Sequence, residues 1–167
     1  MITCARALSC EGMKNLLRKH NDLLPRHTFI SILPETMRKN ENGVNWPANS
    51  DRWLSMFFED IRPEHLPLLP ILEDQFGRNL VKFNETHADA IVNFLDQCHS
   101  RPEPETLYTN CVAGISRSGA IASFAVEVFN LDRHAFHKEN PQILPNNLVL
   151  YLLRERWQLR LAGKIVS

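Results

Sequence analysis

Between positions 111 and 118 the sequence reads Cys-Val-Ala-Gly-Ile-Ser-Arg-Ser, and these residue types together can bind and attack a tetrahedral anion. Backbone N–H groups in a short loop that opens a helix form an anion site, and Gly114 permits the tight turn. Arg117 offers a planar fork of donors to two phosphate oxygens. Such a positive field lowers the pKa of a cysteine from about 8.5 to roughly 3.5–7.5, which makes Cys111 a candidate nucleophile.

A cysteine and an arginine separated by five residues are a weak signal alone, because chance often produces that spacing in a chain with four cysteines and 13 arginines. Glycine at the fourth position of the motif and serine directly after the arginine make the match far more specific. The alternative is that Cys111 is a buried structural cysteine on a strand. The Gly, Arg and Ser around it favour the reactive role.

The composition is that of a globular protein, and we expect a single domain over residues 1–167. Hydrophobic residues make up 44% of the chain, and 19 Lys+Arg balance 19 Asp+Glu. These values exclude a disordered chain, and the lack of a basic excess argues against a nucleic-acid partner. No apolar run approaches the roughly 20 residues of a membrane span, so we expect no membrane partner.

The four cysteines are Cys4, Cys10, Cys98 and Cys111, and none belongs to a Cys-x-x-Cys pair, so the sequence predicts no metal site. Arg6 interrupts the apolar stretch at the start of the chain, which does not resemble a secretion signal. We therefore expect free thiols in a reducing, cytoplasmic compartment.

The pattern of apolar residues predicts alternating strands and helices. Strands are predicted at 2–8, 27–33, 53–58 and 107–111, and helices at 10–20, 85–97, 117–131 and from Asn146, as the cap, to Trp157. A capping box is predicted at Thr86 and Asp89, a long loop at 35–52 and a turn at 101–105. Three prolines within 61–83 break any long helix there, so this segment is predicted to be a partly packed, proline-rich insertion.

This alternation predicts an α/β fold with a central, mostly parallel sheet of four to five strands flanked by helices. Ligands of such sheets bind beyond the carboxyl ends of the strands. The junction between the strand at 107–111 and the helix at 117–131 is therefore the expected site, and it coincides with the motif around Cys111.

At these residues the chain resembles the cysteine-dependent protein tyrosine phosphatase superfamily, in particular its compact dual-specificity-like branch of bacterial and phage type. Residues 111–118 resemble the signature loop, and the likeness extends to Phe-Phe-Glu-Asp-Ile at 57–61, the helix at 85–97 and the Pro-Asn pair at 145–146. It covers about residues 53–157, and the first 50 residues match by strand order alone. The position of the motif in the C-terminal third separates the chain from the low-molecular-weight phosphatases.

The resemblance implies a phosphate monoester hydrolase that acts on a phosphorylated protein or a small phosphate ester, without metal or other cofactor. Cys111 would form a cysteinyl-phosphate, Ser118 would help its sulfur leave, and Asp60 would serve as general acid and then base. The phosphate oxygens would be held by the Arg117 side chain and by the backbone of Val112, Ala113, Gly114, Ile115, Ser116 and Arg117.

Two departures from the family pattern leave alternatives open. Asn110 stands where the family has a histidine that helps to lower the cysteine pKa. Asp60 lies 51 residues before Cys111, a longer gap than the family shows, so Asp74 is an alternative acid, and a third possibility is that neither serves. These departures motivate the alternative function of a pseudophosphatase that binds phosphoproteins without turnover.

Two further substrate classes fit the sequence less well. The residues between Cys111 and Arg117 carry no charge, whereas lipid phosphatases of this superfamily tend to have basic residues there. An RNA 5′-phosphate would favour a basic surface, which the charge balance does not support. A rhodanese-like site would not explain the Arg-Ser step after the loop.

Overall fold

The computed structural model describes residues 1–38 and 47–163. Within these ranges the strands are β1 (Ile2–Ser9), β2 (Thr28–Leu33), β3 (Trp53–Phe57) and β4 (Glu105–Cys111). The α-helices are α1 (Cys10–Lys19), α2 (Leu69–Phe76), α3 (Glu85–His99), α4 (Arg117–Val128), α5 (Arg133–Glu139) and α6 (Asn147–Leu161). Short 3-10 turns lie at η1 (Asn21–Leu23), η2 (Glu35–Met37) and η3 (Pro63–Leu68). Among the described helices, none is both long enough and apolar enough to cross a membrane.

The four described strands form one parallel sheet in the order β1-β4-β2-β3, which confirms the predicted fold class. β4 lies between β1 and β2, with Cys111 opposite Ser9 on one side and Asn110 opposite Ser31 on the other. Since all strands run the same way, their carboxyl ends meet at one edge of the sheet. The residues that follow β1, β2, β3 and β4 therefore come together at that edge.

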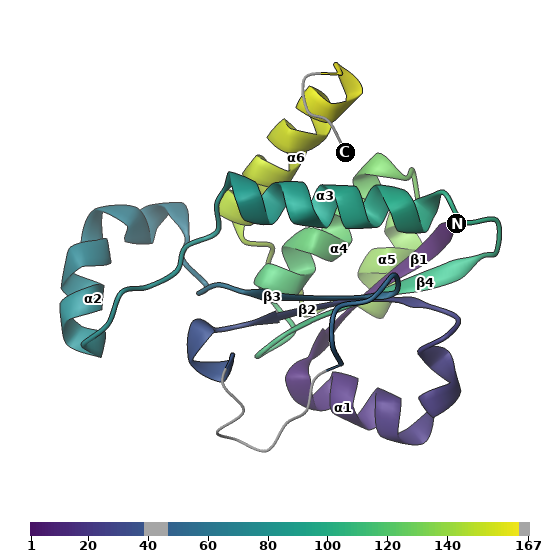
Figure 1. Ribbon diagram of the computed structural model, residues 1–167, viewed down its shortest axis with the longest axis horizontal. Coiled ribbons are helices and arrows are strands. Elements are labelled where there is room, and N and C mark those ends of the chain that lie inside the picture. Colours follow the sequence, from purple (N-terminus) through teal and green to yellow (C-terminus); the bar gives the residue numbers. More distant parts are fainter. Residues whose placement is uncertain (39–46, 164–167) are drawn as a thin grey trace.

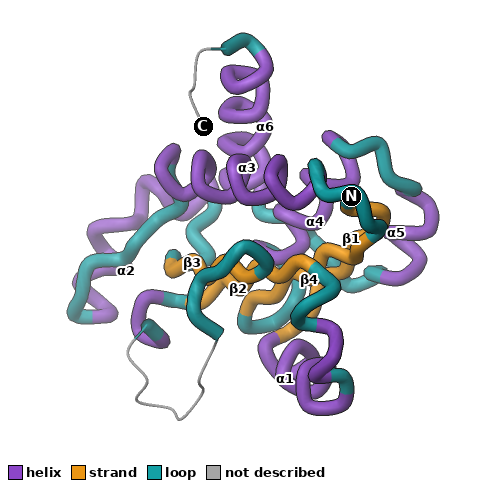
Figure 2. The backbone as a smooth tube through the Cα atoms, turned by 45° about the vertical axis from the view of Figure 1, so that its right-hand side comes forward, coloured by secondary structure: helices purple, strands orange, loops and turns teal. Residues whose placement is uncertain are grey.

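Helices cover both faces of the sheet, so β2, in its interior, is buried at every residue. Figure 1 shows α1 on one face and α3, α4 and α6 on the other, and the 45° turn of Figure 2 agrees. Ile30 and Ile32 of β2 belong to the large core under α3, α4 and α6. Phe29 points to the α1 face, where its ring stacks on Trp53 and Tyr108 at 5.1 and 5.4 Å. Packing in this larger core holds α4, which begins at Arg117, against the sheet.

The proline-rich segment 61–83 leaves the sheet after β3, forms η3 and α2, and returns; we call it the arm. Figures 1 and 2 show α2 at the side of the molecule, away from the other helices. Gly77 ends α2 in a left-handed conformation, and the Leu80 N–H then donates to the Glu73 carboxylate at 2.9 Å. The backbone rejoins the sheet where Glu59 N–H donates to the Val81 carbonyl at 2.7 Å. The arm thus begins and ends beside the residues that follow β3.

Several predicted boundaries were wrong. α3 is capped by Asn84, whose side chain accepts the His87 N–H, and the predicted box at Thr86 does not form the cap. α4 ends at Val128 instead of 131, and α5 was not predicted. β4 begins at Glu105, which was predicted to be in a turn. The loop predicted at 35–52 contains η2, and its part at 39–46 lies outside the described residues.

Candidate active site

A short loop joins β4 to α4, and it begins at Cys111 and ends at Arg117. Gly114, at its centre, has φ +75°, a backbone conformation that residues with a side chain rarely adopt. A Cβ at this position would lie 2.4 Å from the Ser9 nitrogen and 2.5 Å from the Leu8 carbonyl carbon. Glycine is therefore required both by the backbone conformation and by the close approach of the loop to the end of β1.

The carbonyl groups of the loop are anchored from outside. The Val112 carbonyl accepts from Cys10 N–H at 3.3 Å and the Ser116 carbonyl from Asn146 N–H at 3.2 Å. Between them, the Gly114 carbonyl accepts a hydrogen bond from the Gln142 side-chain amide, and the Ile115 carbonyl accepts one from the Leu144 N–H. In a trans peptide the following N–H points opposite to the carbonyl, so the amides of the loop point away from these anchors and towards its interior. Such a ring of N–H groups is an anion site.

The Cys111 side chain is buried, with 2% of the residue exposed, and its Sγ lies 3.1 Å from the Ser118 Oγ. Burial alone would raise the pKa of the thiol. The hydrogen bonds from the Ser118 hydroxyl and backbone, the charge of Arg117 and the Ile115 N–H outweigh burial and lower the Cys111 pKa below its ordinary value. The loop therefore stabilises a thiolate at Cys111.

Arg117 is 5% exposed, and its Nη1 donates to the Phe58 carbonyl at 2.6 Å, directly after β3. Within the part of the chain that the structure describes, its Nε is buried without a hydrogen-bond partner. A buried donor of this kind is destabilising unless an acceptor occupies the site. An anion in the loop would supply that acceptor.

Asp60 is held against the same loop. Its Oδ1 accepts hydrogen bonds from the Ser116 hydroxyl and from the Asn146 amide, both at 2.8 Å. Asn146 also donates to the Ile61 carbonyl at 3.0 Å, and its Oδ1 caps α6. Asp74 instead lies exposed on α2, at the side of the molecule. The structure therefore brings Asp60, and not Asp74, to the loop.

Asn110 faces away from Cys111, towards α1. Its Oδ1 accepts from the Ser31 hydroxyl at 2.6 Å, and its Nδ2 donates to the Cys10 Sγ at 3.6 Å. Asn110 is fully buried. The burial of Cys10 raises the pKa of the Cys10 thiol, although the hydrogen bond from Asn110 opposes this shift. This network ties β2, β4 and the start of α1 together beneath the loop, so Asn110 supports the strand end that carries Cys111.

Sequence reasoning missed several residues of this site. Asn146 was predicted as a helix cap, which is confirmed, but its contact with Asp60 was not foreseen. Gln142 and Ser31 were not singled out, because each acts through a partner far away in the chain. The helix-cap pattern at Pro145-Asn146 was the one local signal that marked this region.

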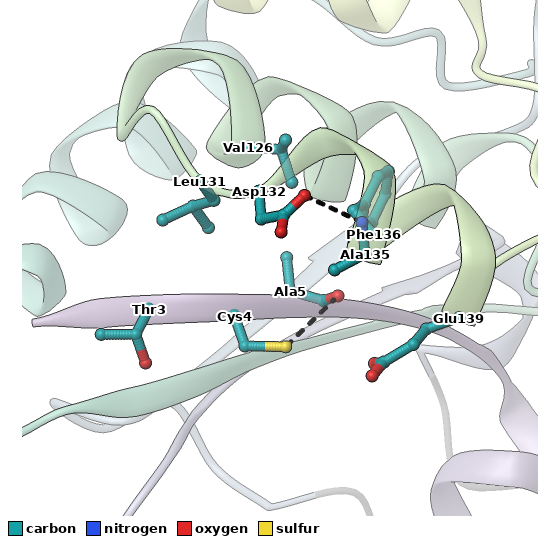
Figure 3. Close-up of a pocket in the computed structure, with 9 residues that line it drawn as sticks. All are labelled: Thr3, Cys4, Ala5, Val126, Leu131, Asp132, Ala135, Phe136 and Glu139. Carbon is teal, nitrogen blue, oxygen red and sulfur yellow. Dashed lines mark hydrogen bonds between the residues drawn. The ribbon is translucent and has the colours of Figure 1, made fainter.

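A small cavity at the other end of the molecule does not belong to the site. Figure 3 shows it between β1 and α5, with Cys4 and Ala5 on one side and Asp132 and Phe136 on the other. Its volume is about 50 Å³, and one water occupies about 30 Å³ of liquid. The Asp132 carboxylate is already used to cap α5, where it accepts the Ala135 N–H at 2.9 Å. The cavity has room for little more than ordered water.

The fold is similar to that of a solved structure of DUSP15, with a TM-score of 0.52 over 97% of this chain and 92% of that one, at 19% identity. The chain has the fold of a dual-specificity phosphatase. The chain is also similar to the Yvh1 phosphatase domain from Chaetomium thermophilum, at 14% identity and a TM-score of 0.49 over 97% of this chain and 93% of that one. A third similar structure is the human tyrosine phosphatase-like serine/threonine/tyrosine-interacting protein, at 18% identity and a TM-score of 0.43 over 92% of this chain and 87% of that one. No protein-family model and no curated protein matches the sequence.

At these identities the likeness is one of fold, and folds do not determine function. The phosphatase fold accounts for the parallel sheet and for a loop between a central strand and a buried helix. What this particular chain can do depends on the side chains that it places there.

Proposed function

We propose that the protein is a phosphate monoester hydrolase, a protein tyrosine or dual-specificity phosphatase that acts through a cysteinyl-phosphate. The observation that carries this proposal is the 2.8 Å hydrogen bond between Ser116 and Asp60, because it joins a carboxyl group to the loop that holds Cys111 and Arg117. A nucleophile, an anion site and an acid that meet at one loop are the parts that phosphoryl transfer to a cysteine requires.

In the first step the Cys111 thiolate attacks phosphorus. The S–P bond forms, the P–O bond of the ester breaks, and Asp60 gives its proton to the leaving oxygen. The inward N–H groups of the loop and the free Nε of Arg117 stabilise the charge on the phosphoryl oxygens. The burial of Cys111 and Arg117 strengthens this stabilisation, because fewer waters compete for the same oxygens.

In the second step water hydrolyses the cysteinyl-phosphate. The Asp60 carboxylate takes a proton from the water, whose oxygen bonds to phosphorus while the S–P bond breaks. The Ser118 hydroxyl, 3.1 Å from Sγ, donates to the sulfur as it leaves with its electron pair. The products are inorganic phosphate and the starting enzyme, with Asp60 protonated again and Cys111 a thiolate.

The test is a pH–rate profile with p-nitrophenyl phosphate in the presence of EDTA. Because the loop lowers the Cys111 pKa, the rising limb of the wild-type profile should lie below the ordinary pKa of a thiol. Cys111→Ser should remove turnover. Asp60→Asn should lower kcat by about 10²–10⁴ and remove the falling limb. Cys4→Ser, at the opposite end of the sheet from the loop, is the matched control and should keep the wild-type profile.

The contrary result is a wild-type protein that binds vanadate or tungstate through Arg117 but hydrolyses nothing. That outcome would make the protein a pseudophosphatase, the alternative that is motivated by Asn110, whose side chain is committed to Ser31 and Cys10. Full activity in Cys111→Ser would exclude a mechanism through a cysteinyl-phosphate.

A further inference from the structure

A groove of about 410 Å³ lies between the arm and the residues that follow β3. Asp60 forms part of its wall on the side of the sheet, and Leu68, Leu72 and Phe76 line it on the side of the arm. Pockets that bind small molecules span roughly 300–1,000 Å³. The groove is therefore large enough to hold one or two bulky side chains of another molecule.

The arm lines the groove mostly with apolar side chains, beside His65 and the paired Arg78, and two of the apolar ones face solvent. Leu68 is 49% exposed and Phe76 is 63% exposed, although both are side chains that proteins usually bury. Single exposed apolar residues are common, but a group of them lining one groove marks a binding surface.

The groove and the candidate active site share one residue, Asp60. The Oδ1 of this residue is bonded to Ser116 in the phosphate loop, and the same residue lines the groove. In the proposed reaction the leaving oxygen of the substrate must lie within hydrogen-bond reach of Asp60. Atoms of the substrate beyond that oxygen therefore lie at the mouth of the groove, and the substrate itself is its natural occupant.

The charges around the groove argue for an apolar occupant. Arg78, which lines it, is already paired with Glu59 at 2.8 Å, and α2 carries Glu73 and Asp74. The exposed side chains of the loop include Val112 and Ile115. An inositol polyphosphate, an RNA end or an anionic bilayer would meet Glu59, Asp60 and apolar side chains, with only His65 and the already paired Arg78 as basic groups in the lining. An apolar peptide side chain would be buried favourably.

We propose that this groove binds a bulky apolar side chain next to the phosphorylated residue of a protein substrate. The preferred substrates are then phosphopeptides with residues such as leucine beside the phosphorylated position. This inference rests on the proposed function, because it uses Asp60 to locate the leaving group.

The test compares two phosphotyrosyl peptides of equal length and charge, one with leucine and one with glutamine on both sides of the phosphotyrosine. The wild type should show a kcat/KM at least about tenfold higher for the leucine peptide, since one methylene in an apolar pocket already changes kcat/KM by roughly 10–200-fold. Phe76→Ala should bring the ratio of the two values towards one.

Ile71→Ala is the matched control, because Ile71 lies on the same helix, is 56% exposed and does not line the groove. It should keep the wild-type ratio. The rate with p-nitrophenyl phosphate is measured for each variant to detect any change at the reacting centre. Equal values of kcat/KM for the two peptides, or an equal fall of the ratio in both variants, would overturn the inference.

Two other outcomes are distinguishable. If a short-chain phosphoinositide is a better substrate than the leucine peptide and Phe76→Ala removes that advantage, the groove binds acyl chains and the inference is wrong. If the wild type hydrolyses no substrate, the proposed function fails, and the groove is then tested by the Kd of the two intact phosphopeptides. Tighter binding of the leucine peptide would support the groove, and equal binding would overturn it.

Discussion

At the scale of single residues, Ser118 has the most direct influence on Cys111, because its hydroxyl lies 3.1 Å from the sulfur. We predict that Ser118→Ala raises the Cys111 pKa. A hydrogen bond to a charged group contributes about 1.5–3 kcal/mol, so the loss of the Ser118 hydroxyl makes the thiolate less stable relative to the thiol. The measurement is the rate of alkylation by iodoacetamide against pH, whose midpoint should move upward.

Ser123→Ala is the control for this variant. Ser123 lies on the same helix, and within the described ranges its Oγ is buried without a hydrogen-bond partner. Its removal should leave the midpoint unchanged. An equal shift in both variants would mean that helix packing, and not the hydroxyl at Ser118, sets the reactivity of Cys111.

The residues around the loop show how far the sequence could predict the site. Residues 111–118 are consecutive, so their chemistry is readable from the sequence, and the structure places them at the end of β4, in the loop that follows and in the first turn of α4. The bond between Asn146 and Asp60 joins residues 86 positions apart, and no local pattern encodes such a contact. Asp60 was favoured because it follows a buried strand, and its position beside Ser116 agrees with that expectation; its role stays a prediction.

At the scale of elements, the turn from β4 into α4 depends on Gly114. Left-handed backbone strain at a residue with a side chain costs about 1–3 kcal/mol. We predict that Gly114→Ala destabilises the fold by more than this, because the added Cβ would also overlap the backbone of Ser9 and Leu8. The measurements are the free energy of unfolding in urea and the affinity for vanadate, and both should fall.

Gly77→Ala separates these two causes. Gly77, at the end of α2, has φ +62° and no atom within 4 Å of the Cβ position, so its substitution adds the strain alone. A smaller loss of stability is expected there, with no change in vanadate affinity. Equal losses at the two positions would show that the contact with β1 does not matter.

Elements were predictable where neighbouring residues determine them. The β-branched and aromatic residues of β2 predict its strand, and the structure confirms it. The predicted start of β4 was wrong because the charge of Glu105 favours an exposed turn. In the structure Glu105 is 1% exposed, and its carboxylate is bonded to Arg52, Arg101 and Thr28. Those partners come from distant parts of the chain. α5, seven residues long with one buried side chain, has too little apolar periodicity to be detected.

At the scale of the whole molecule, stability should depend on pH through half-buried histidines. The pKa of His87 is lowered mainly by burial and also by the charge of Arg38, while Glu35 opposes the shift. Its ring packs on Phe58 and Phe83, and in the described part of the chain its Nδ1 is buried without a partner. The pKa values of His27 and His99 are also lowered mainly by burial.

A lowered folded pKa means that the unfolded chain binds the proton more readily. Stability is therefore complete above the unfolded pKa of about 6.5 and is lost as the pH falls below it. We predict that Tm falls between pH 7.5 and 5.5, with His87 as one cause of the fall. His87→Phe should flatten this dependence in differential scanning calorimetry, and an unchanged slope would exclude His87 as the cause.

The strand order has a consequence for how the chain assembles. β1 and β2 are made early, but neither is bonded to the other, since β4 lies between them. Until β4 leaves the ribosome, β1 has no neighbour in the sheet, and the only ladder available to the described strands is that of β2 with β3. Joining β4 to β1 closes the longest loop between paired strands of the sheet, which is the entropically slow step of such a topology. That strand ends in Cys111, so the event that completes the sheet also sets the Cys111 sulfur beneath its loop, and a half-folded chain has no assembled anion site.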